Sequence, residues 1–261
     1  MSLFSTPFDP ARDTALVTGA GNGIGRAIAQ ALVGEGVRTV FADVSAARVH
    51  AAISASEQPA LAVPWVGDLA RLEACDDLLA AAHAALGEIT HFVHSASPPR
   101  READHVLAVD RRTWQDMHAV NLDAGFHLSR ELAKRLIAAK RPGSFLLLTS
   151  LHAGTPRNLP HYSTAKAGLA MLVKELAKTL GRHDIRVNAL VPGAIAAGGF
   201  VADPALARHI PLGRLGEAGD LVPMALTVLS NKLSAYVTGA AFVVDGGLSL
   251  TNWFETPALE E

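Results

Sequence analysis

Short apolar runs of strand length alternate along the chain with longer segments in which apolar residues recur every three to four positions. Between Tyr162 and Leu180 the apolar side chains keep the 3.6-residue spacing of a helix with one buried stripe. Short, mostly apolar runs suit strands that are buried on both faces of a sheet. We expect strands at residues 15–18, 39–42, 61–66, 90–94, 144–149, 186–191 and 241–244.

Helical patterns fill the intervals between these runs. Strands that alternate with helices connect through right-handed crossovers and build a parallel sheet that is covered on both faces. The predicted fold class is α/β, a Rossmann-like doubly wound parallel sheet of about seven strands with helices on both faces. No linker, repeat or low-complexity tract interrupts the pattern, so residues 1–261 are expected to form a single domain with an N-terminal extension at 1–12. The helices are expected at residues 24–33, 46–55, 69–86, 114–139, 162–180 and 220–229.

The composition narrows the class of protein. A net charge of -2 and the absence of a basic block give no reason to expect a nucleic-acid partner. No apolar run approaches the ~18 residues that span a bilayer, and the N-terminus lacks a signal-peptide pattern, so no membrane association is expected. Cys75 is the single cysteine, which excludes an internal disulfide framework and fits a reducing compartment. We therefore expect a cytoplasmic protein.

The stretch TGAGNGIG, residues 18–25, lies between the first strand and the first helix. In parallel sheets, ligands bind outside the carboxyl ends of the strands, and a helix N-terminus there attracts phosphate. Glycines let a pyrophosphate approach the backbone closely. The stretch predicts a dinucleotide site at Gly19, Gly23 and Gly25.

Two acidic residues at the ends of later strands refine this prediction. Asp43 ends the second strand, where a carboxylate can accept hydrogen bonds from both ribose hydroxyls and repel a 2′-phosphate. With a neutral Asn22 in the glycine turn, this favours NAD as the cofactor, with NADP less favoured. Asp68 follows the third strand and is compatible with two roles, acceptance from the adenine amino group and N-capping of the next helix.

The segment HYSTAKAGL carries Tyr162 and Lys166, which share one face of a helix at positions i and i+4. A phenol is a poor acid near neutral pH, and a neighbouring ammonium stabilises the phenolate. Such a pair can exchange a proton with a carbonyl or an alcohol. Ser150 ends the fifth strand, where its hydroxyl can donate a hydrogen bond to a substrate carbonyl oxygen.

These motifs occur in one order along the chain, together with HAVNLDAGF, RVNALVPGAI and the terminal TGAAFVVDGG. The combination resembles the short-chain dehydrogenase/reductase superfamily, in its single-domain branch, over residues 11–249. The resemblance implies that Tyr162 is the catalytic acid/base and that Lys166 stabilises its phenolate and binds the nicotinamide ribose. It also implies that Ser150 polarises the substrate oxygen and that Asn121 holds a water in a proton relay to Lys166.

The resemblance implies a cofactor site, a substrate pocket and an oligomer. Residues 194–213 resemble a short substrate lid, and the closing VDGG resembles a segment that supports tetramer contacts, so a homotetramer is favoured. His152 and His161 are each expected to face solvent, with contact to a polar substrate as the alternative. The histidines show no metal-ligand spacing, so no metal is assigned. The implied cofactor-binding residues are Gly19, Asn22, Gly23, Ile24, Gly25, Asp43, Asp68, Leu69, Ser95, Ala96, Pro192, Gly193 and Ile195, and the implied substrate-binding residues are Ser97, Leu151, His152, Asn158 and Phe200.

The chain departs from the family pattern at three places. Where the family usually has Asn-Asn-Ala-Gly after the fourth strand, this chain has residues 94–97, HSAS, and Ser97 is expected to need a different backbone conformation from glycine. Ala197 stands where the family often has a threonine that bonds the carboxamide. Strict counting from Tyr162 selects Thr149 as the polarising hydroxyl, whereas the alignment of SLHAGTP selects Ser150, which we prefer.

The function that these observations predict is an NAD-dependent oxidoreductase. It would interconvert a secondary alcohol, such as a sugar, a polyol or another small hydroxy compound, and its ketone by hydride transfer. A 3-oxoacyl-thioester reductase of the same family is one alternative, although the lid carries only Arg208 and Arg214 as basic residues. A non-catalytic NAD-binding regulatory protein is the alternative from another class. The altered loop at 94–97 favours it, and the retained Tyr162 and Lys166 oppose it.

Overall fold

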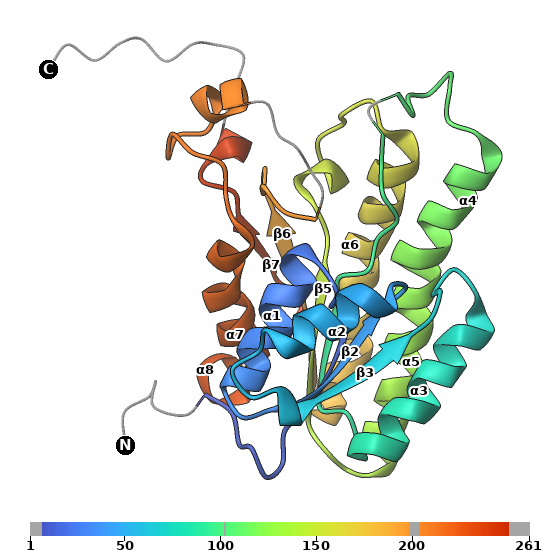
Figure 1. Ribbon diagram of the computed structural model, residues 1–261, viewed down its shortest axis with the longest axis vertical. Coiled ribbons are helices and arrows are strands. Elements are labelled where there is room, and N and C mark those ends of the chain that lie inside the picture. Colours follow the sequence, from blue (N-terminus) through green and yellow to red (C-terminus); the bar gives the residue numbers. More distant parts are fainter. Residues whose placement is uncertain (1–6, 102, 199–203, 251–261) are drawn as a thin grey trace, which may run out of the picture.

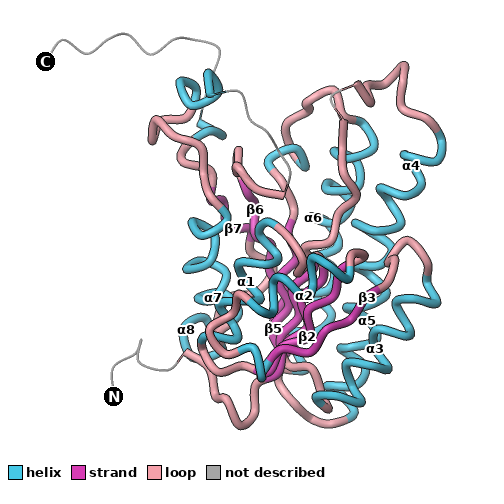
Figure 2. The backbone as a smooth tube through the Cα atoms, viewed as in Figure 1, coloured by secondary structure: helices cyan, strands magenta, loops and turns pink. Residues whose placement is uncertain are grey.

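The computed structural model describes residues 7–101, 103–198 and 204–250. Its strands are β1 (Thr14–Thr18), β2 (Arg38–Asp43), β3 (Ala62–Val66), β4 (His91–His94), β5 (Gly143–Leu148), β6 (Ile185–Pro192) and β7 (Ala241–Val244). They form one sheet in the spatial order β3-β2-β1-β4-β5-β6-β7, and every pairing is parallel (Figure 1, Figure 2). The predicted doubly wound parallel sheet is therefore confirmed.

Helices cover both faces of this sheet (Figure 1). They are α1 (Gly23–Gly34), α2 (Ala46–Ser54), α3 (Leu72–Leu86), α4 (Arg111–His118), α5 (Ala124–Ala138), α6 (Pro160–Leu180), α7 (Val222–Leu229) and α8 (Asn231–Ser234). Helices α1, α2 and α7 pack on one face around a core that includes Phe41. Helices α3, α5 and α6 pack on the other face around Phe92 and Phe145, whose rings meet edge to face with centroids 5.8 Å apart.

Local signals set where several helices begin. The side-chain oxygen of Asn22 accepts a hydrogen bond from Gly23 N at 2.8 Å and caps α1. That of Asp110 accepts from Thr113 N at 2.8 Å and caps α4. Pro160 opens α6, where a residue without an N–H group loses no helical hydrogen bond. The helix that carries Tyr162 therefore begins two residues earlier than the apolar pattern predicts.

The structure corrects three predicted helices. The helix expected from residue 69 begins at Leu72, because Asp68 accepts from Ala70 N at 3.0 Å and forms a turn instead. The helix expected at 114–139 is α4 and α5 joined by a π-helical turn, Ala119–Asp123. The helix expected from residue 220 begins as a 3-10 turn, Ala218–Leu221, and becomes α-helical only at Val222, just before Pro223.

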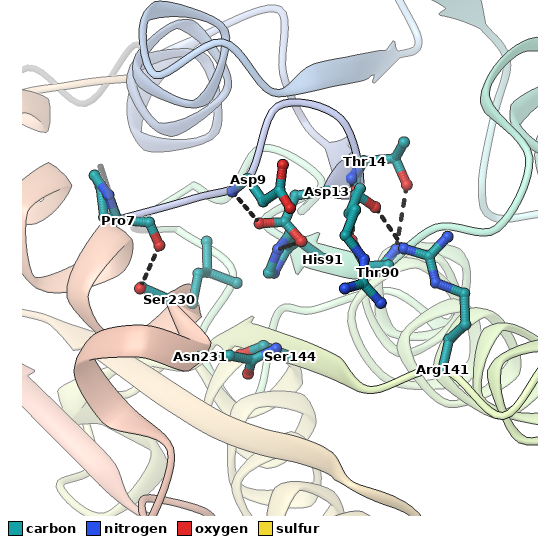
Figure 3. Close-up of polar contacts among 12 residues, drawn as sticks. Pro7, Asp9, Asp13, Thr14, Thr90, His91, Arg141, Ser144, Ser230 and Asn231 are labelled. Carbon is teal, nitrogen blue, oxygen red and sulfur yellow. Dashed lines mark hydrogen bonds and ion pairs between the residues drawn. The ribbon is translucent and has the colours of Figure 1, made fainter. Parts of the chain in front are cut away.

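Polar contacts at the amino ends of the strands bring distant segments together (Figure 3). Thr14 N donates to the Thr90 hydroxyl at 3.0 Å, and this hydroxyl donates back to the Thr14 carbonyl at 3.1 Å. The Ser230 hydroxyl donates to the Pro7 carbonyl at 2.6 Å. Phe8 is buried and meets the His91 ring edge-on. The described part of the predicted N-terminal extension is therefore packed against the sheet and the turn that precedes α8.

Arg186 in β6 is the buried centre of this amino-end network. Its side chain is 7% exposed, and burial lowers the pKa of the guanidinium to about 10, so it stays charged at neutral pH. Within the part of the chain that the structure describes, its N–H groups donate to neutral acceptors, and these hydrogen bonds offset the cost of burying the charge. These acceptors are the Ser144 hydroxyl, the Asn231 side-chain oxygen and the carbonyls of Val228, Leu229 and Val237.

We expect Arg186→Met to lower the free energy of unfolding by about 2–4 kcal/mol, because it leaves several buried carbonyl groups without a donor. Urea denaturation of both proteins measures the change. Arg182→Met, at an exposed position after α6, is the matched control and should change the value by less than about 0.5 kcal/mol. Equal stability of the Arg186→Met variant and the wild type would show that the network does not stabilise the fold.

Candidate active site

The strand order reverses between β1 and β4, so the crossovers leave a gap at their carboxyl ends. Thr18 and His94 are the last residues of these two strands and lie opposite each other in the parallel register. The glycine turn follows Thr18, and the segment Ser95–Ala96–Ser97 follows His94. The two segments that the sequence assigned to the cofactor are therefore neighbours.

The glycine turn is held in a backbone conformation that side chains would disturb. Gly19 and Gly23 have φ values of 68° and 55°, in the left-handed region that glycine favours. A Cβ on Gly19 would lie 2.9 Å from the Ala96 backbone, and one on Gly25 would lie 2.4 Å from the Gly19 carbonyl oxygen. The turn thus presents bare backbone at the N-terminus of α1, which fits a pyrophosphate.

A cavity of about 430 Å³ opens beside the glycine turn. Its wall joins the start of α1 to two loops of the C-terminal half of the chain. The lining residues are Asn22, Gly23, Arg26, Ala27, Gln30, Ala196, Ala197, Gly198, Glu217, Ala218 and Gly219. The structure therefore brings the described beginning of the predicted lid against the glycine turn.

Asp43 at the end of β2 contacts the glycine turn directly. One carboxylate oxygen accepts from Gly21 N at 3.2 Å, and the other accepts from Ser45 N at 3.0 Å. The second oxygen also lies 3.4 Å from the Arg48 guanidinium, a cation that the sequence analysis did not single out. An arginine beside the ribose site is a feature that can accommodate a 2′-phosphate. Asp43 thus favours NAD, whereas Arg48 favours NADP.

Asp68 and Leu69 follow β3 on the same side of the sheet. Asp68 is not the N-cap of α3. Arg71 occupies that position, and its side chain makes no capping hydrogen bond. Its carboxylate instead fixes the turn through Ala70 N. Leu69 is buried in the core beneath this turn.

His94 connects the cofactor loops to the π-helical turn. Its Nε2 lies 3.1 Å from the carbonyl oxygens of both Val120 and Asn121, which can only accept, so Nε2 carries the proton. Its Nδ1 then accepts from the Thr18 hydroxyl at 3.0 Å. The Thr18 oxygen in turn accepts from the backbone N–H groups of Ser95 and Ala96. Every polar atom of this chain of hydrogen bonds is satisfied only while the imidazole is neutral.

The π-helical turn places Asn121 in the interior. Its side chain is fully buried, and its amide nitrogen donates to the Met117 carbonyl at 2.9 Å. Among the described residues, no group hydrogen-bonds to its side-chain oxygen. A buried oxygen that can still accept a hydrogen bond is suited to bind a donor group of a proton relay.

Tyr162 and Lys166 lie together on α6, as their spacing predicts. Tyr162 is 6% exposed, and the Lys166 ammonium lies 5.7 Å from the centre of its ring. Lys166 donates to the Leu148 carbonyl at the end of β5 at 2.7 Å. Burial, and secondarily the Arg100 guanidinium, lowers the pKa of Lys166 to about 7. A buried lysine that titrates near neutral pH is a group suited to proton transfer.

The two candidate hydroxyls at the end of β5 differ in their contacts. Thr149 donates its hydroxyl to the Leu190 carbonyl at 3.3 Å, inside the sheet. The Ser150 oxygen accepts from His152 N at 3.1 Å, and among the described residues its hydroxyl donates to no acceptor in the sheet. This contrast favours Ser150, the residue that the alignment of SLHAGTP selects. His152 is partly buried, with its ring edge-on to Tyr162 at 6.3 Å.

The segment after β6 is held close to the end of the sheet. A Cβ on Gly193 would lie 2.5 Å from Asp245 Cβ, so the backbone there must be bare. Gly193 N donates to the Val244 carbonyl at 3.0 Å, and Ile195 is buried. Ala196 N donates to the Gly216 carbonyl at 2.8 Å. The resemblance assigns this segment, from Pro192 to Ile195, to the nicotinamide.

The predicted substrate-binding residues differ from one another in burial and in backbone conformation. Ser97 is exposed and lies outside the left-handed region, so no glycine-like conformation is needed there. Leu151 packs partly into the core, and Asn158 has a φ of 58°, which asparagine tolerates. Phe200 lies outside the described residues. The expectation that His161 faces solvent is wrong, because its side chain is fully buried with Nε2 3.9 Å from the Asp104 carboxylate.

Sequence reasoning missed Thr18, Arg48, His94 and Arg100. Thr18 and His94 are the first letters of TGAGNGIG and HSAS, two motifs that drew attention to their glycine and serine residues instead. Arg100 follows two prolines in a loop, yet its guanidinium carbon lies 4.5 Å from the centre of the Tyr162 ring. No periodicity or spacing could have indicated this contact, because it depends on the path of the loop.

We expect the stability of the protein to fall as the pH drops from 6.5 toward 4. Burial, and secondarily Lys166, lowers the pKa of His94 from 6.5 to about 4, so in this window the unfolded chain binds a proton that the folded chain does not. The loss due to His94 is roughly 3 kcal/mol. Urea titrations at several pH values measure it. His94→Asn removes the titration and should flatten the profile, and parallel profiles for the two proteins would contradict the assignment.

Three comparisons with known proteins bear on this site. Residues 19–249 match the family model described as enoyl-(acyl carrier protein) reductase. The chain is 32% identical to L-rhamnose 1-dehydrogenase (NAD(P)(+)) of Azotobacter vinelandii, over 90% of this chain and 96% of that enzyme. It is 35% identical to D-erythrulose reductase of Gallus gallus, over 89% of this chain and 94% of that enzyme.

A solved structure agrees with both the fold and these relatives. The 3-ketoacyl-(acyl-carrier-protein) reductase of Brucella melitensis complexed with NADH superposes with a TM-score of 0.85 at 27% identity, over 92% of this chain and all of that chain, 100%. The superposition therefore covers most of this chain. Together with the Tyr162–Lys166 pair at the end of the sheet, it shows that this chain belongs to the short-chain dehydrogenase/reductase superfamily.

Proposed function

We propose that this protein is an NAD-dependent dehydrogenase that interconverts a secondary alcohol of a small molecule and its ketone. The observation that carries the proposal is the buried pair of Tyr162 and Lys166, which is bonded to the end of β5, the strand that Thr149 and Ser150 follow. That the relatives reported above include a sugar dehydrogenase and a ketose reductase supports the reaction class. The substrate class is expected to include sugars, polyols or other small hydroxy compounds.

Four side chains have separate roles in the proposed reaction. Tyr162 takes the hydroxyl proton as the alcohol is oxidised and returns it when the ketone is reduced. Ser150 donates a hydrogen bond to the substrate oxygen and holds it near Tyr162. Lys166 favours the phenolate by its charge, and its pKa of about 7 lets it pass a proton at neutral pH. The buried side-chain oxygen of Asn121, which has no hydrogen-bond partner among the described residues, would accept a hydrogen bond from the water that links this relay to solvent.

The residues present fit a nicotinamide dinucleotide. The bare backbone of the glycine turn would hold the pyrophosphate, Asp43 the adenosine ribose, and Pro192 to Ile195 the nicotinamide end. When bound, the dinucleotide supplies the acceptor or donor of the hydride. Ala197 carries no side-chain donor for the carboxamide, so backbone groups of this segment would have to bind it.

The alternatives fit the described residues less well. A carrier-bound thioester substrate would be favoured by free basic side chains near the lid, but Arg214 is paired with Asp220 at 2.7 Å. A regulatory protein that only binds the dinucleotide would not need a lysine buried beside a tyrosine, an arrangement that costs desolvation energy. We therefore keep the dehydrogenase as the proposed function.

We also propose that the protein acts as a homo-oligomer, with a tetramer favoured, in the cytoplasm. An apolar groove of about 270 Å³ lies between α5 and α6, and Phe126, Ile137 and Leu172 are among its lining residues. Phe126 and Ile137 are exposed, which is typical of a face that packs against another protein surface.

The single cysteine, Cys75, is buried and free, which fits the proposed reducing compartment. No helix of the described residues has the length and apolarity to span a bilayer.

Tyr162→Phe should lower kcat by on the order of 10²- to 10⁴-fold, because the acid/base group is removed without loss of ring packing. Absorbance at 340 nm measures turnover on a panel of secondary alcohols and ketones, and calorimetry measures cofactor binding, which should be unchanged. Tyr236→Phe, at a fully exposed tyrosine, is the matched control and should behave as the wild type. Turnover that survives in the Tyr162→Phe variant would refute the role given to this residue.

Asp43→Asn should weaken NAD binding by on the order of tenfold, since a charged acceptor for the ribose becomes neutral. Arg48→Gln should leave NAD binding unchanged and weaken NADP binding by a similar factor, roughly tenfold. Calorimetric titration of the wild type and both variants with each dinucleotide gives the dissociation constants. Tighter binding of NADP than of NAD to the wild type would contradict the NAD preference and assign the decisive role to Arg48.

A further inference from the structure

The side chain of Met117, in the last turn of α4, is fully buried near the proposed acid/base. It belongs to a small apolar cluster with Leu159, Tyr162 and Ala165 at the start of α6. Helix α4 lies beside α6, so this cluster joins the two helices (Figure 1). The proposed reaction uses Tyr162 and Asn121. It gives no role to Met117, which shares a cluster with the first and is hydrogen-bonded to the second.

Two groups of Met117 accept from the same side-chain amide. The amide nitrogen of Asn121 donates to the Met117 carbonyl at 2.9 Å and to the Met117 sulfur at 3.0 Å. An amide nitrogen carries two N–H groups, whereas a carbonyl oxygen and a thioether sulfur carry no proton and can only accept. The end of the amide that faces Met117 is therefore the nitrogen, because an oxygen in its place would face two further acceptors.

This orientation determines which part of Asn121 is left for the reaction. Its backbone carbonyl lies 3.1 Å from His94 Nε2, and its amide nitrogen is bonded to Met117. Its side-chain oxygen is buried, and among the described residues no group hydrogen-bonds to it. That oxygen is the acceptor that the proposed relay from Lys166 uses. A rotated amide would offer the relay a donor in place of an acceptor.

The sulfur is the part of this arrangement that depends on the residue type at position 117. Every residue there has a carbonyl, but an aliphatic side chain has no acceptor. Without the sulfur, one buried N–H group of Asn121 loses its partner, which disfavours the orientation that the carbonyl alone must then maintain. The same sulfur lies 3.9 Å from the hydroxyl of Ser97, so it also reaches the loop after β4.

We propose that Met117 is a positioning residue, which acts on the reaction through Asn121. Its sulfur and its carbonyl hold the amide nitrogen, so that the side-chain oxygen of Asn121 faces the proton relay from Lys166. The proposal rests on the proposed function and adds a residue to the same site. The thioether makes and breaks no bond in the reaction. Its effect is on proton transfer, and it leaves the binding of the substrate unchanged.

The first test is Met117→Leu, a volume-conserving change that removes the acceptor. On a secondary alcohol that the wild type oxidises, kcat should fall by roughly 2- to 10-fold, with KM changed by less than about twofold. The solvent deuterium isotope effect on kcat should rise, because proton transfer through the relay becomes slower. Met171→Leu, at an exposed methionine of α6, is the matched control and should behave as the wild type. An unchanged kcat in Met117→Leu would overturn the proposal.

A double-mutant cycle separates positioning from packing. If Met117 acts through Asn121, then Met117→Leu should have no further effect on kcat in a protein that already carries Asn121→Ala. The same fold-change in both backgrounds would overturn the proposal, since that is the effect of altered packing alone.

A measurement without turnover separates this inference from the proposed function. In ¹⁵N NMR of the wild type, both side-chain amide protons of Asn121, identified by their loss in Asn121→Ala, should exchange slowly with solvent. In Met117→Leu one of them should exchange faster by on the order of tenfold. If no secondary alcohol is turned over, the proposed reaction fails, and this result still decides how the amide is held. Fast exchange in the wild type, or equal exchange in the two proteins, would overturn the role of the sulfur.

Discussion

The neutral imidazole of His94 joins the glycine turn, the segment after β4 and the π-helical turn, and so holds them in one arrangement. It accepts from Thr18 at the end of β1 and donates to the carbonyl groups of the π-helical turn. Through Thr18 it also fixes the backbone of Ser95 and Ala96. Two carbonyl groups of the π-helical turn, those of Val120 and Asn121, lie within hydrogen-bond distance of His94 Nε2. The cofactor loops and Asn121 are therefore positioned by one side chain.

Burial of cations sets the electrostatics of the site. Lys166 lowers the pKa of His94, and Arg100 lowers the pKa of Lys166, in both cases after burial as the larger cause. His94 and Lys166 are thus each easier to deprotonate because another cation is near. An anion that enters the site acts in the opposite direction and favours their protonated forms. Substrate charge and proton transfer are consequently coupled in this arrangement.

The positions of the strands and the parallel, doubly wound sheet could be predicted from the sequence, because alternating apolar runs and glycine motifs are local signals. The Tyr162–Lys166 pair followed from helical spacing alone. What could not be predicted depends on contacts between distant segments. The break at the π-helical turn, the burial of His161 and the contact of Arg100 with Tyr162 all result from tertiary packing. The start of α3 was missed because Asp68 has two competing uses, a turn and a cap, and the turn prevails.

The pairing of β1 with β4 has a consequence for the order in which the chain acquires its structure. Thr14 meets Thr90, 76 positions later, and Pro7 meets Ser230, 223 positions later. Contacts between residues so far apart form slowly, because a long loop must close before they are made. During synthesis, β1 and β2 can associate long before β4 emerges from the ribosome. The gap between β1 and β4 cannot form before residues 91–94 are available, and the first residues dock last, because Pro7 meets Ser230.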